Sequence, residues 1–363
     1  MSSSAEAPHV MWPDSLIRPS ATSRLAYLDL NHWINLAKYQ TGHRDGFRHK
    51  PLFEACRAAS SEQRVLFVLT DSLFAEISNI KDPRQRRDIS HVVGTLTHFE
   101  YLLGRPDLMR HEIQFALNSL TNQVRSRFAP VRLVRRGVLH AFGRVGGLRI
   151  EDQYGRDISE HLRQEQGAPQ FDSWLRDLEL TAEEMLLAGP ADQDIPALIA
   201  AGYAPEVARA TTERRAEQER EQAGRLDAAE KNWRRGRLRD VIAAREASFE
   251  LIDLLTEEFT ARGIDLGQAT GGTLQGVRAL MLGMPSTAVS IELKTRYHQD
   301  GQKKWTVNDV HDIDALSVAV PYCDIVFTDA AARNALVAAH VDHRMNTVLP
   351  RTSQDMVEIL NSL

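Results

Sequence analysis

The sequence predicts an α/β fold: a small parallel sheet flanked by helices, with a large, mainly helical insertion. Short apolar strands alternate with helical patterns near both ends of the chain, which is typical of parallel sheets covered by helices. The middle of the chain is instead rich in Ala, Glu and Arg, which favour helices. A chain of 363 residues, 43% of them hydrophobic, is long enough to bury a sizeable core.

Four short stretches predict the strands of the sheet. They are "LAYLDL" at 25–30, "VLFVLT" at 65–70, "DIVFT" at 324–328 and "NTVL" at 346–349. Each is followed by a helical pattern, at 31–40, 72–80, 329–340 and 353–361 respectively. We therefore expect one α/β domain formed by residues 20–104 plus 300–363, separated into two halves by the insertion at 105–299.

Within the insertion, residues 204–262 predict long, largely solvated helices, because charged residues dominate and helix breakers are few. Apolar residues become dense only near the end of this stretch, where we expect it to dock: Phe249, Leu251, Ile252, Leu254 and Leu255. The glycine-rich stretch 263–285 predicts a loop.

Composition excludes several classes of protein. A net charge of −5 does not suit a basic nucleic-acid coat, so any site for a polyanion must be local. Two cysteines make neither a disulfide framework nor a CxxC metal site. The start of the sequence does not resemble a signal peptide, and no apolar run is long enough for a bilayer, so we expect a cytoplasmic protein.

Acidic residues follow the predicted strands, where ligands of parallel α/β sheets bind. Asp29 ends the first strand, Glu76 lies in the helix after the second, and Asp329 ends the third. A further helix, from about 308 to 321, carries Asp312 and Asp314 in its early turns. These two residues flank the buried side of that helix on opposite edges, and the periodicity does not choose between them.

Carboxylates gathered at one edge of a sheet repel each other unless they bind a cation or take up protons. Oxygen ligands of this kind suit Mg²⁺ or Mn²⁺. We therefore predict a metal site from Asp29, Glu76, Asp329 and either Asp312 or Asp314, with all five as candidate catalytic residues. Taken singly, each acid is also explained as a helix cap or a solvated side chain.

These residues resemble the motifs of the PIN-domain nucleases. The first motif is similar to "YLDLNHW", with Asp29 and Asn31, and the second to "TDSLFAEI", with Glu76. The third resembles "DIDALSVAV", which offers Asp314 with Asp312 as its rival. The fourth is similar to "IVFTDAA", with Thr328 and Asp329. The resemblance covers about residues 25–104 and 300–363.

The resemblance implies a metal-dependent endoribonuclease that uses Mg²⁺ or Mn²⁺ to cut single-stranded or structured RNA and leaves a 5′-phosphate. Asn31 and Thr328 would then contact substrate, and a toxin or defence role is compatible. One alternative is a PIN-like scaffold that binds RNA or protein without cutting. A haloacid-dehalogenase-like phosphatase is less favoured, because that family carries a second acid at the position of Asn31.

The insertion adds a possible RNA surface. Eight arginines lie between residues 105 and 144, and we predict that Arg132, Arg135 and Arg136 contact RNA phosphates. The alternative is that these arginines pair with acidic residues elsewhere in the chain. The insertion could also form a homodimer interface or bind a protein partner.

Overall fold

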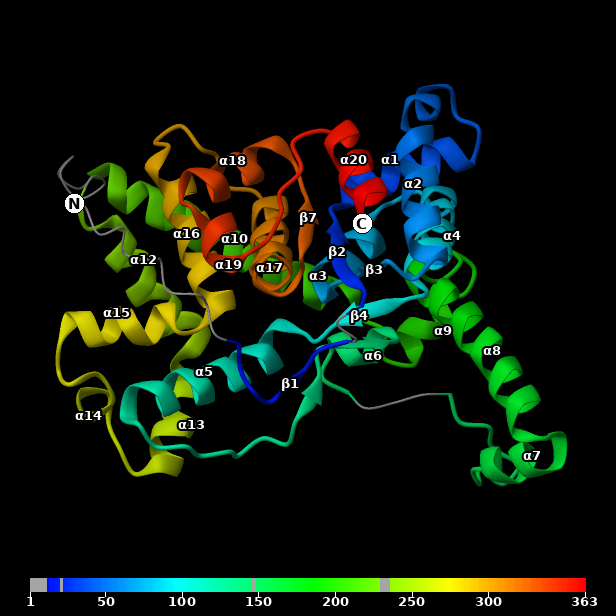
Figure 1. The fold of residues 1–363 in the computed structure, drawn as a ribbon, viewed down its shortest axis with the longest axis horizontal. Coiled ribbons are helices and arrows are strands. Elements are labelled where there is room, and N and C mark those ends of the chain that lie inside the picture. Colours follow the sequence, from blue (N-terminus) through cyan, green and yellow to red (C-terminus); the bar gives the residue numbers. More distant parts are fainter. Residues whose placement is uncertain (1–11, 20–21, 145–147, 229–235) are drawn as a thin grey trace.

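The computed structural model describes residues 12–19, 22–144, 148–228 and 236–363, and it is an α/β structure in which helices predominate. At its centre lies a three-stranded parallel sheet in the order β3–β2–β7 (Figure 1). These strands are β2 (Arg24–Leu28), β3 (Val65–Val68) and β7 (Ile325–Phe327). Strands from opposite ends of the chain are therefore neighbours, as the alternating pattern predicted.

Single bridges extend the central sheet on both sides. Leu69 pairs with Tyr101 of β4 (Glu100–Leu102), which runs antiparallel to β6 (Val134–Arg136). On the other side, Val348 pairs with Ile325, so the stretch predicted as a fourth strand contributes one bridge. A separate two-stranded sheet joins β1 (Leu16–Ile17) to β5 (Val131–Arg132).

The helices that follow the strands begin and end close to the predicted residues. Polar side chains set the start of three of them: Asp29, Thr70 and Asp329 accept hydrogen bonds from the first turns of α1, α3 and α18. The helices of this part are α1 (Leu30–Gln40), η1 (Arg44–His49), α2 (Lys50–Ser61), α3 (Asp71–Asn79), α4 (Pro83–Thr97), α18 (Ala330–Ala338), α19 (Val341–Met345) and α20 (Ser353–Ser362).

Helix α17 (Val307–Tyr322) runs into β7 and is almost entirely buried. Its first turn is fixed by a capping box, in which the side chains of Thr306 and Asp309 bond each other's backbone N–H groups. The helix packs against α3, α10 and α16, so it lies between the sheet and the insertion. The position of α17 therefore depends on both parts of the chain.

The insertion is mainly helical, as expected. Its elements are α5 (Arg105–Thr121), α6 (Val138–Ala141), α7 (Ser159–Gln166), α8 (Ala168–Ala188), α9 (Ile195–Ala200), α10 (Pro205–Ala228), α12 (Leu238–Glu246), the π-helical turn η2 (Ala247–Leu251), α13 (Ile252–Arg262), α14 (Leu266–Thr270), α15 (Leu274–Leu282) and α16 (Pro285–Gln299). Helix α8 packs against α4 toward its C-terminal end, and its N-terminal end extends away from the rest of the molecule together with α7 (Figure 1).

Two details of the insertion differ from the sequence-based expectations. The stretch 263–285 is not a loop but holds α14 and α15, because Asp265 and Thr273 cap these helices with hydrogen bonds from backbone N–H groups. Phe249 and Ile252 were expected to dock, yet they are 64% and 50% exposed. Leu251, in the same segment, is buried as expected.

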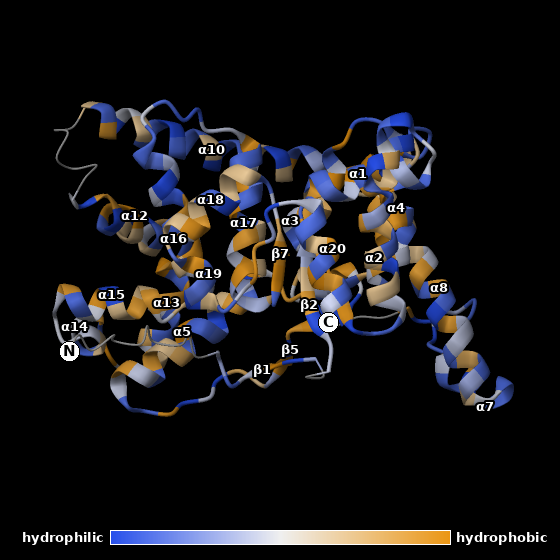
Figure 2. Cartoon of the chain, turned by 45° about the horizontal axis from the view of Figure 1, so that its top comes forward, coloured by the Kyte–Doolittle hydropathy of each residue, from blue (hydrophilic) through white to orange (hydrophobic). Residues whose placement is uncertain are grey.

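Apolar side chains form two clusters that meet along shared helices. The larger cluster surrounds the central sheet, where apolar colour gathers around β2 and β7 in Figure 2. The smaller one joins α5, α12, α13 and α15. Helix α5 contributes Leu108 to the first cluster and Ile113 to the second. The insertion was expected to begin at residue 105. This residue is the first of α5, a helix that packs into both clusters.

Among the described residues, no helix combines the length and the apolar character required to span a bilayer.

Because α5 belongs to both clusters, we expect the two parts to unfold together. Replacing Ile113, which is fully buried, with Ala should lower the free energy of unfolding by about 2–5 kcal/mol, and replacing it with Val by about 1 kcal/mol. Urea titration followed by circular dichroism and by tryptophan fluorescence should give one coincident transition for each protein. Two separate transitions, of which only one responds to Ile113→Ala, would contradict this coupling.

Candidate metal centre

Asp29 lies at the carboxyl end of the central strand β2. Its backbone N–H donates to the carbonyl of Phe327, which joins the ends of β2 and β7. One carboxylate oxygen accepts from the N–H of Leu30 at 2.6 Å, and the other lies 3.4 Å from the hydroxyl of Thr328. The side chain is only 6% exposed. Asp29 is therefore a helix cap that also places a carboxylate in a buried position.

Two other acids approach Asp29 from separate helices. Glu76 comes from α3 and Asp312 from α17. One carboxylate oxygen from each of Asp29, Glu76 and Asp312 lies within 4.8 Å of the other two. We call these three residues the acidic trio. The strand-end argument correctly placed Asp29 and Glu76 together, and the structure selects Asp312 as the third member.

The electrostatics of the acidic trio are those of crowded, poorly solvated carboxylates. Burial, followed by the charges of Asp312 and Asp29, raises the pKa of Glu76 to about 9. Burial, followed by the charges of Asp29 and Asp329, raises the pKa of Asp312 to about 8. Burial also raises the pKa of Asp29. Proximity and burial therefore penalise the fully ionised trio, and a bound cation would remove that penalty.

The residues of the trio fit a hard divalent cation. Three carboxylate oxygens at this spacing are the ligand type that Mg²⁺ and Mn²⁺ prefer. In addition, Oε2 of Glu76 is buried without a hydrogen-bond partner. An acceptor of this kind normally has a partner in a folded protein, and a metal ion would supply one. The trio could hold Mg²⁺ or Mn²⁺.

Asp329 lies beside the trio but is not one of the three. Its Oδ1 accepts from the N–H groups of Ala331 and Ala332, at 2.5 and 3.1 Å, and so caps α18. Its charge raises the pKa of both Asp29 and Asp312. Asp329 was predicted as a metal ligand, but the group that could hold an ion consists of Asp29, Glu76 and Asp312. Asp329 instead caps α18 and places a negative charge next to the trio.

Asp314 does not lie with the trio, in contrast to its predicted place among the ligands. Its Oδ1 accepts from Arg105 at 3.0 Å and from Arg215 at 2.8 Å, and its Oδ2 accepts from Arg215 at 2.5 Å. The charge of Arg215 and its hydrogen bond outweigh burial and hold the pKa of Asp314 well below its usual range. This carboxylate is fully occupied by arginines on the opposite edge of α17.

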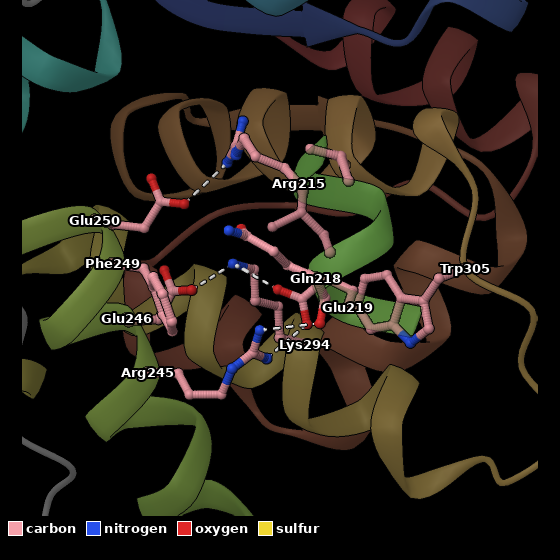
Figure 3. A pocket seen from close by; sticks show the side chains of 11 residues that line it. Arg215, Gln218, Glu219, Arg245, Glu246, Phe249, Glu250, Lys294 and Trp305 are labelled. Carbon is pink, nitrogen blue, oxygen red and sulfur yellow. Dashed lines mark hydrogen bonds and ion pairs between the residues drawn. The ribbon is translucent and has the colours of Figure 1, made fainter. Parts of the chain in front are cut away.

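The two arginines belong to a larger buried ionic network between the insertion and α17. Arg105 also bonds Glu246 at 3.2 Å, and Arg215 lies 3.4 Å from Glu250. Lys294 pairs with Glu246 and with Glu219, as Figure 3 shows where these side chains converge from α10, α12 and α16. Opposite charges alternate throughout this network, which is why it can be buried.

The other predicted substrate residues are less directly placed. Asn31 is exposed in the first turn of α1, one turn from the trio, and Thr328 is buried against Asp29. Arg132 and Arg135 are exposed, whereas Arg136 lies 3.6 Å from Glu100. Since β6 is separated from β2 by β4 and β3, Arg135 and Arg136 lie roughly 14 Å across the sheet from the strand of Asp29. Their contact with RNA stays a prediction.

Two residues next to the trio were missed by the sequence analysis. Tyr297 of α16 lies close enough for the charges of Asp312 and Asp329 to raise the pKa of its phenol, after burial. Lys303 precedes α17, and its charge lowers the pKa of Asp312. A lysine shortly before a helix that carries acids was a visible signal, but nothing in the sequence showed that the side chain points back to them.

The chain matches no protein-family model, no curated protein and no solved structure. One buried and two partly buried carboxylates around one point could hold a divalent cation, and such a cation could bind a phosphate and activate water.

The first prediction from the site concerns the metal-free protein. A carboxyl whose pKa is raised by folding stabilises the protein below its unfolded pKa, and this contribution is lost as pH rises through the folded pKa. For Glu76 and Asp312 the loss extends from about pH 4 to about pH 9. Glu76→Gln should therefore raise the free energy of unfolding at pH 8 by about 1–3 kcal/mol.

Urea titration in EDTA at two pH values checks this expectation. At pH 4 the advantage of Glu76→Gln should vanish, because Glu76 is then mostly protonated in both the folded and the unfolded chain. Adding Mn²⁺ at pH 8 should raise the melting temperature of the original protein more than that of the variant. A variant that is less stable than the original at pH 8 without metal would contradict a repulsive trio.

The second prediction separates Asp314 from Asp312, which lie two residues apart on one helix. Asp314→Asn leaves Arg105 and Arg215 with a neutral partner, so the free energy of unfolding at pH 7 should fall by about 3–5 kcal/mol. The matched change Asp312→Asn should keep or raise the stability of the metal-free protein while weakening Mn²⁺ binding, measured by calorimetry. Weakened Mn²⁺ binding by a stable Asp314→Asn protein would restore Asp314 as a ligand.

Proposed function

We propose that this chain is a metal-dependent endoribonuclease of PIN-like type, which hydrolyses RNA phosphodiester bonds at the acidic trio. The observation that carries the proposal is the convergence of Asp29, Glu76 and Asp312 within 4.8 Å, with one buried oxygen of Glu76 unpartnered. Sites that gather carboxylates with strongly raised pKa values are more often functional than structural. Mg²⁺ or Mn²⁺ is the cofactor that fits these ligands.

The arrangement of the sheet supports the PIN-like interpretation. Parallel strands from the two ends of the chain are adjacent, and the acids of the first and second motifs lie at their carboxyl ends. The third motif fits with Asp312, and the fourth provides Asp329 beside the trio. The order of acids along the chain is therefore compatible with the proposed family, with Asp314 assigned to a structural role.

In this proposal the three acids of the trio hold the metal ion that carries out the chemistry. A bound divalent cation would polarise the scissile phosphate and activate water. Asp29, held by the N–H of Leu30, keeps one ligand oxygen in place. Glu76 and Asp312 approach from two different helices, so the site forms only when both helices are packed. Asp29 is buried and the other two are partly buried, which limits the competing water around the reacting groups.

The substrate follows from the same proposal. The resemblance to PIN-domain nucleases favours single-stranded or structured RNA, and a role as a toxin or defence ribonuclease suits such an activity. The cytoplasmic location expected from the sequence is part of the same proposal. Exposed Arg132 and Arg135 are available to a strand that extends across the sheet. The insertion, with its projecting α7 and N-terminal end of α8, offers surface for a second copy or a protein partner.

The test is cleavage of end-labelled RNA and DNA oligonucleotides with Mn²⁺ or Mg²⁺. The original protein should cut RNA internally and leave a 5′-phosphate and a 3′-hydroxyl, because water attacks the phosphorus directly. Asp29→Asn should reduce the rate by roughly a hundredfold or more, since it removes a charge that organises the transition state. Asp88→Asn, at an exposed position of α4, is the matched control and should cleave normally.

Two results would overturn the proposal. Release of inorganic phosphate from small phosphate esters, with transient labelling of Asp29, would indicate a phosphatase that uses this residue as a nucleophile. RNA binding without cleavage under any divalent metal would indicate the non-catalytic scaffold instead.

A further inference from the structure

One positive side chain faces the acidic trio from outside the predicted motifs. Nζ of Lys303 bonds Oδ1 of Asp309 at 2.5 Å, and the side chain is 30% exposed. Asp309 lies one helical turn before Asp312, and the charge of Lys303 lowers the pKa of Asp312. Lys303 is thus held one helical turn from Asp312 by its bond to Asp309, with its side chain partly open to solvent.

The position of Lys303 is fixed by aromatic residues. Its Nζ lies 4.7 Å from the centre of the Tyr297 ring, a distance at which a cation is attracted to the ring face. Trp305, two residues later, is buried and packs edge-on against the same ring at 5.7 Å. The ring of Tyr297 therefore contacts both Lys303 and Trp305, and so holds the segment between α16 and α17 in place.

The hydrogen bond to Asp309 leaves other donors of the Lys303 ammonium group available. An ammonium group has three donors, and the bond to Asp309 occupies one. The other oxygen of Asp309 accepts from the N–H and the hydroxyl of Thr306 and so completes the cap of α17. Asp309 thus has partners for both oxygens and serves as a fixed support for Lys303.

Three buried or partly buried cations near α17 are paired with acidic residues away from the trio. Arg105 and Arg215 bind both oxygens of Asp314 on the opposite edge of the helix. Lys294 is buried between Glu246 and Glu219. A strand of nucleic acid that approaches the trio brings its own negative phosphates, and Lys303 is placed to meet them.

We propose that Lys303, seated on the ring of Tyr297, is a substrate-binding residue that contacts a phosphate of the nucleic acid strand next to the metal centre. This inference rests on the proposed nuclease function and adds a residue that determines substrate affinity. Lysine suits the role, because it binds a phosphate as a compact point charge and tolerates variation in the strand.

The experiment is single-turnover cleavage of a labelled, mixed-sequence 12-nucleotide RNA with Mn²⁺, at rising protein concentration and several salt concentrations. Lys303→Ala should raise the half-saturating concentration about five- to tenfold and change the maximal rate less than threefold. The slope of log affinity against log salt should flatten by about 0.7, the value for one phosphate contact on a single strand. Lys303→Arg should recover most of the affinity, because the charge is kept.

Matched variants keep the test specific. Lys304→Ala removes an exposed neighbouring charge of the same kind and should leave both the half-saturating concentration and the salt slope unchanged. Lys303→Gln repeats the test with a side chain that can still bond Asp309, in case the alanine variant does not fold. Calorimetric Mn²⁺ binding should be equal to or tighter than that of the original protein, because a nearby positive charge is removed.

The outcomes separate this inference from the proposed function. If the original protein cleaves RNA but Lys303→Ala and Lys303→Gln behave like Lys304→Ala, the role of Lys303 is overturned and the nuclease function stands. A loss confined to the maximal rate, with an unchanged salt slope, would also overturn it. If the original protein binds Mn²⁺ but neither binds nor cleaves the RNA, the proposed function itself fails, and the role of Lys303 with it.

Discussion

Two arginines form ion pairs with Asp314 and so fix the rotation of α17 about its own axis. The candidate site depends on that rotation. Arg105 comes from α5 and Arg215 from α10, so both arrive from the insertion. Residues two apart on an α-helix are separated by about 200° around its axis. With Asp314 turned toward the arginines, Asp312 is turned toward Asp29 and Glu76. The insertion thereby orients one carboxylate of the trio without contributing one itself.

Helix α17 carries two aspartates in opposite electrical environments. Burial comes first among the causes that act on both, yet the pKa of Asp312 is raised to about 8, whereas that of Asp314 is lowered. The difference comes from the neighbours, since Asp312 faces carboxylates and Asp314 faces guanidinium groups. Oppositely charged partners allow Asp314 to stay buried in one arrangement, whereas crowded carboxylates with raised pKa values make the trio a candidate functional site.

The insertion is structurally continuous with the α/β part. Helices α5 and α16 supply apolar side chains to both clusters, and α16 also carries Tyr297 next to the trio. The network shown in Figure 3 joins α10, α12 and α16 through ion pairs that are largely buried. A change in the position of these helices is therefore expected to shift α17 and, with it, Asp312. A partner that binds the insertion would thus be able to alter the site.

The sequence by itself determined the alternation of strands and helices and the strand end at Asp29. It also determined the place of Glu76 in the helix after the second strand and the opposite edges of Asp312 and Asp314. These features are local, because they follow from the periods of strands and helices. Only the tertiary structure decided which aspartate joins the trio. The arginines that occupy Asp314 lie 209 and 99 residues away along the chain, a distance over which periodicity carries no information. The packing of the helices likewise decided that Phe249 is exposed and that Lys303 lies beside Asp312. The reason is that the environment of a side chain is set by its neighbours in space.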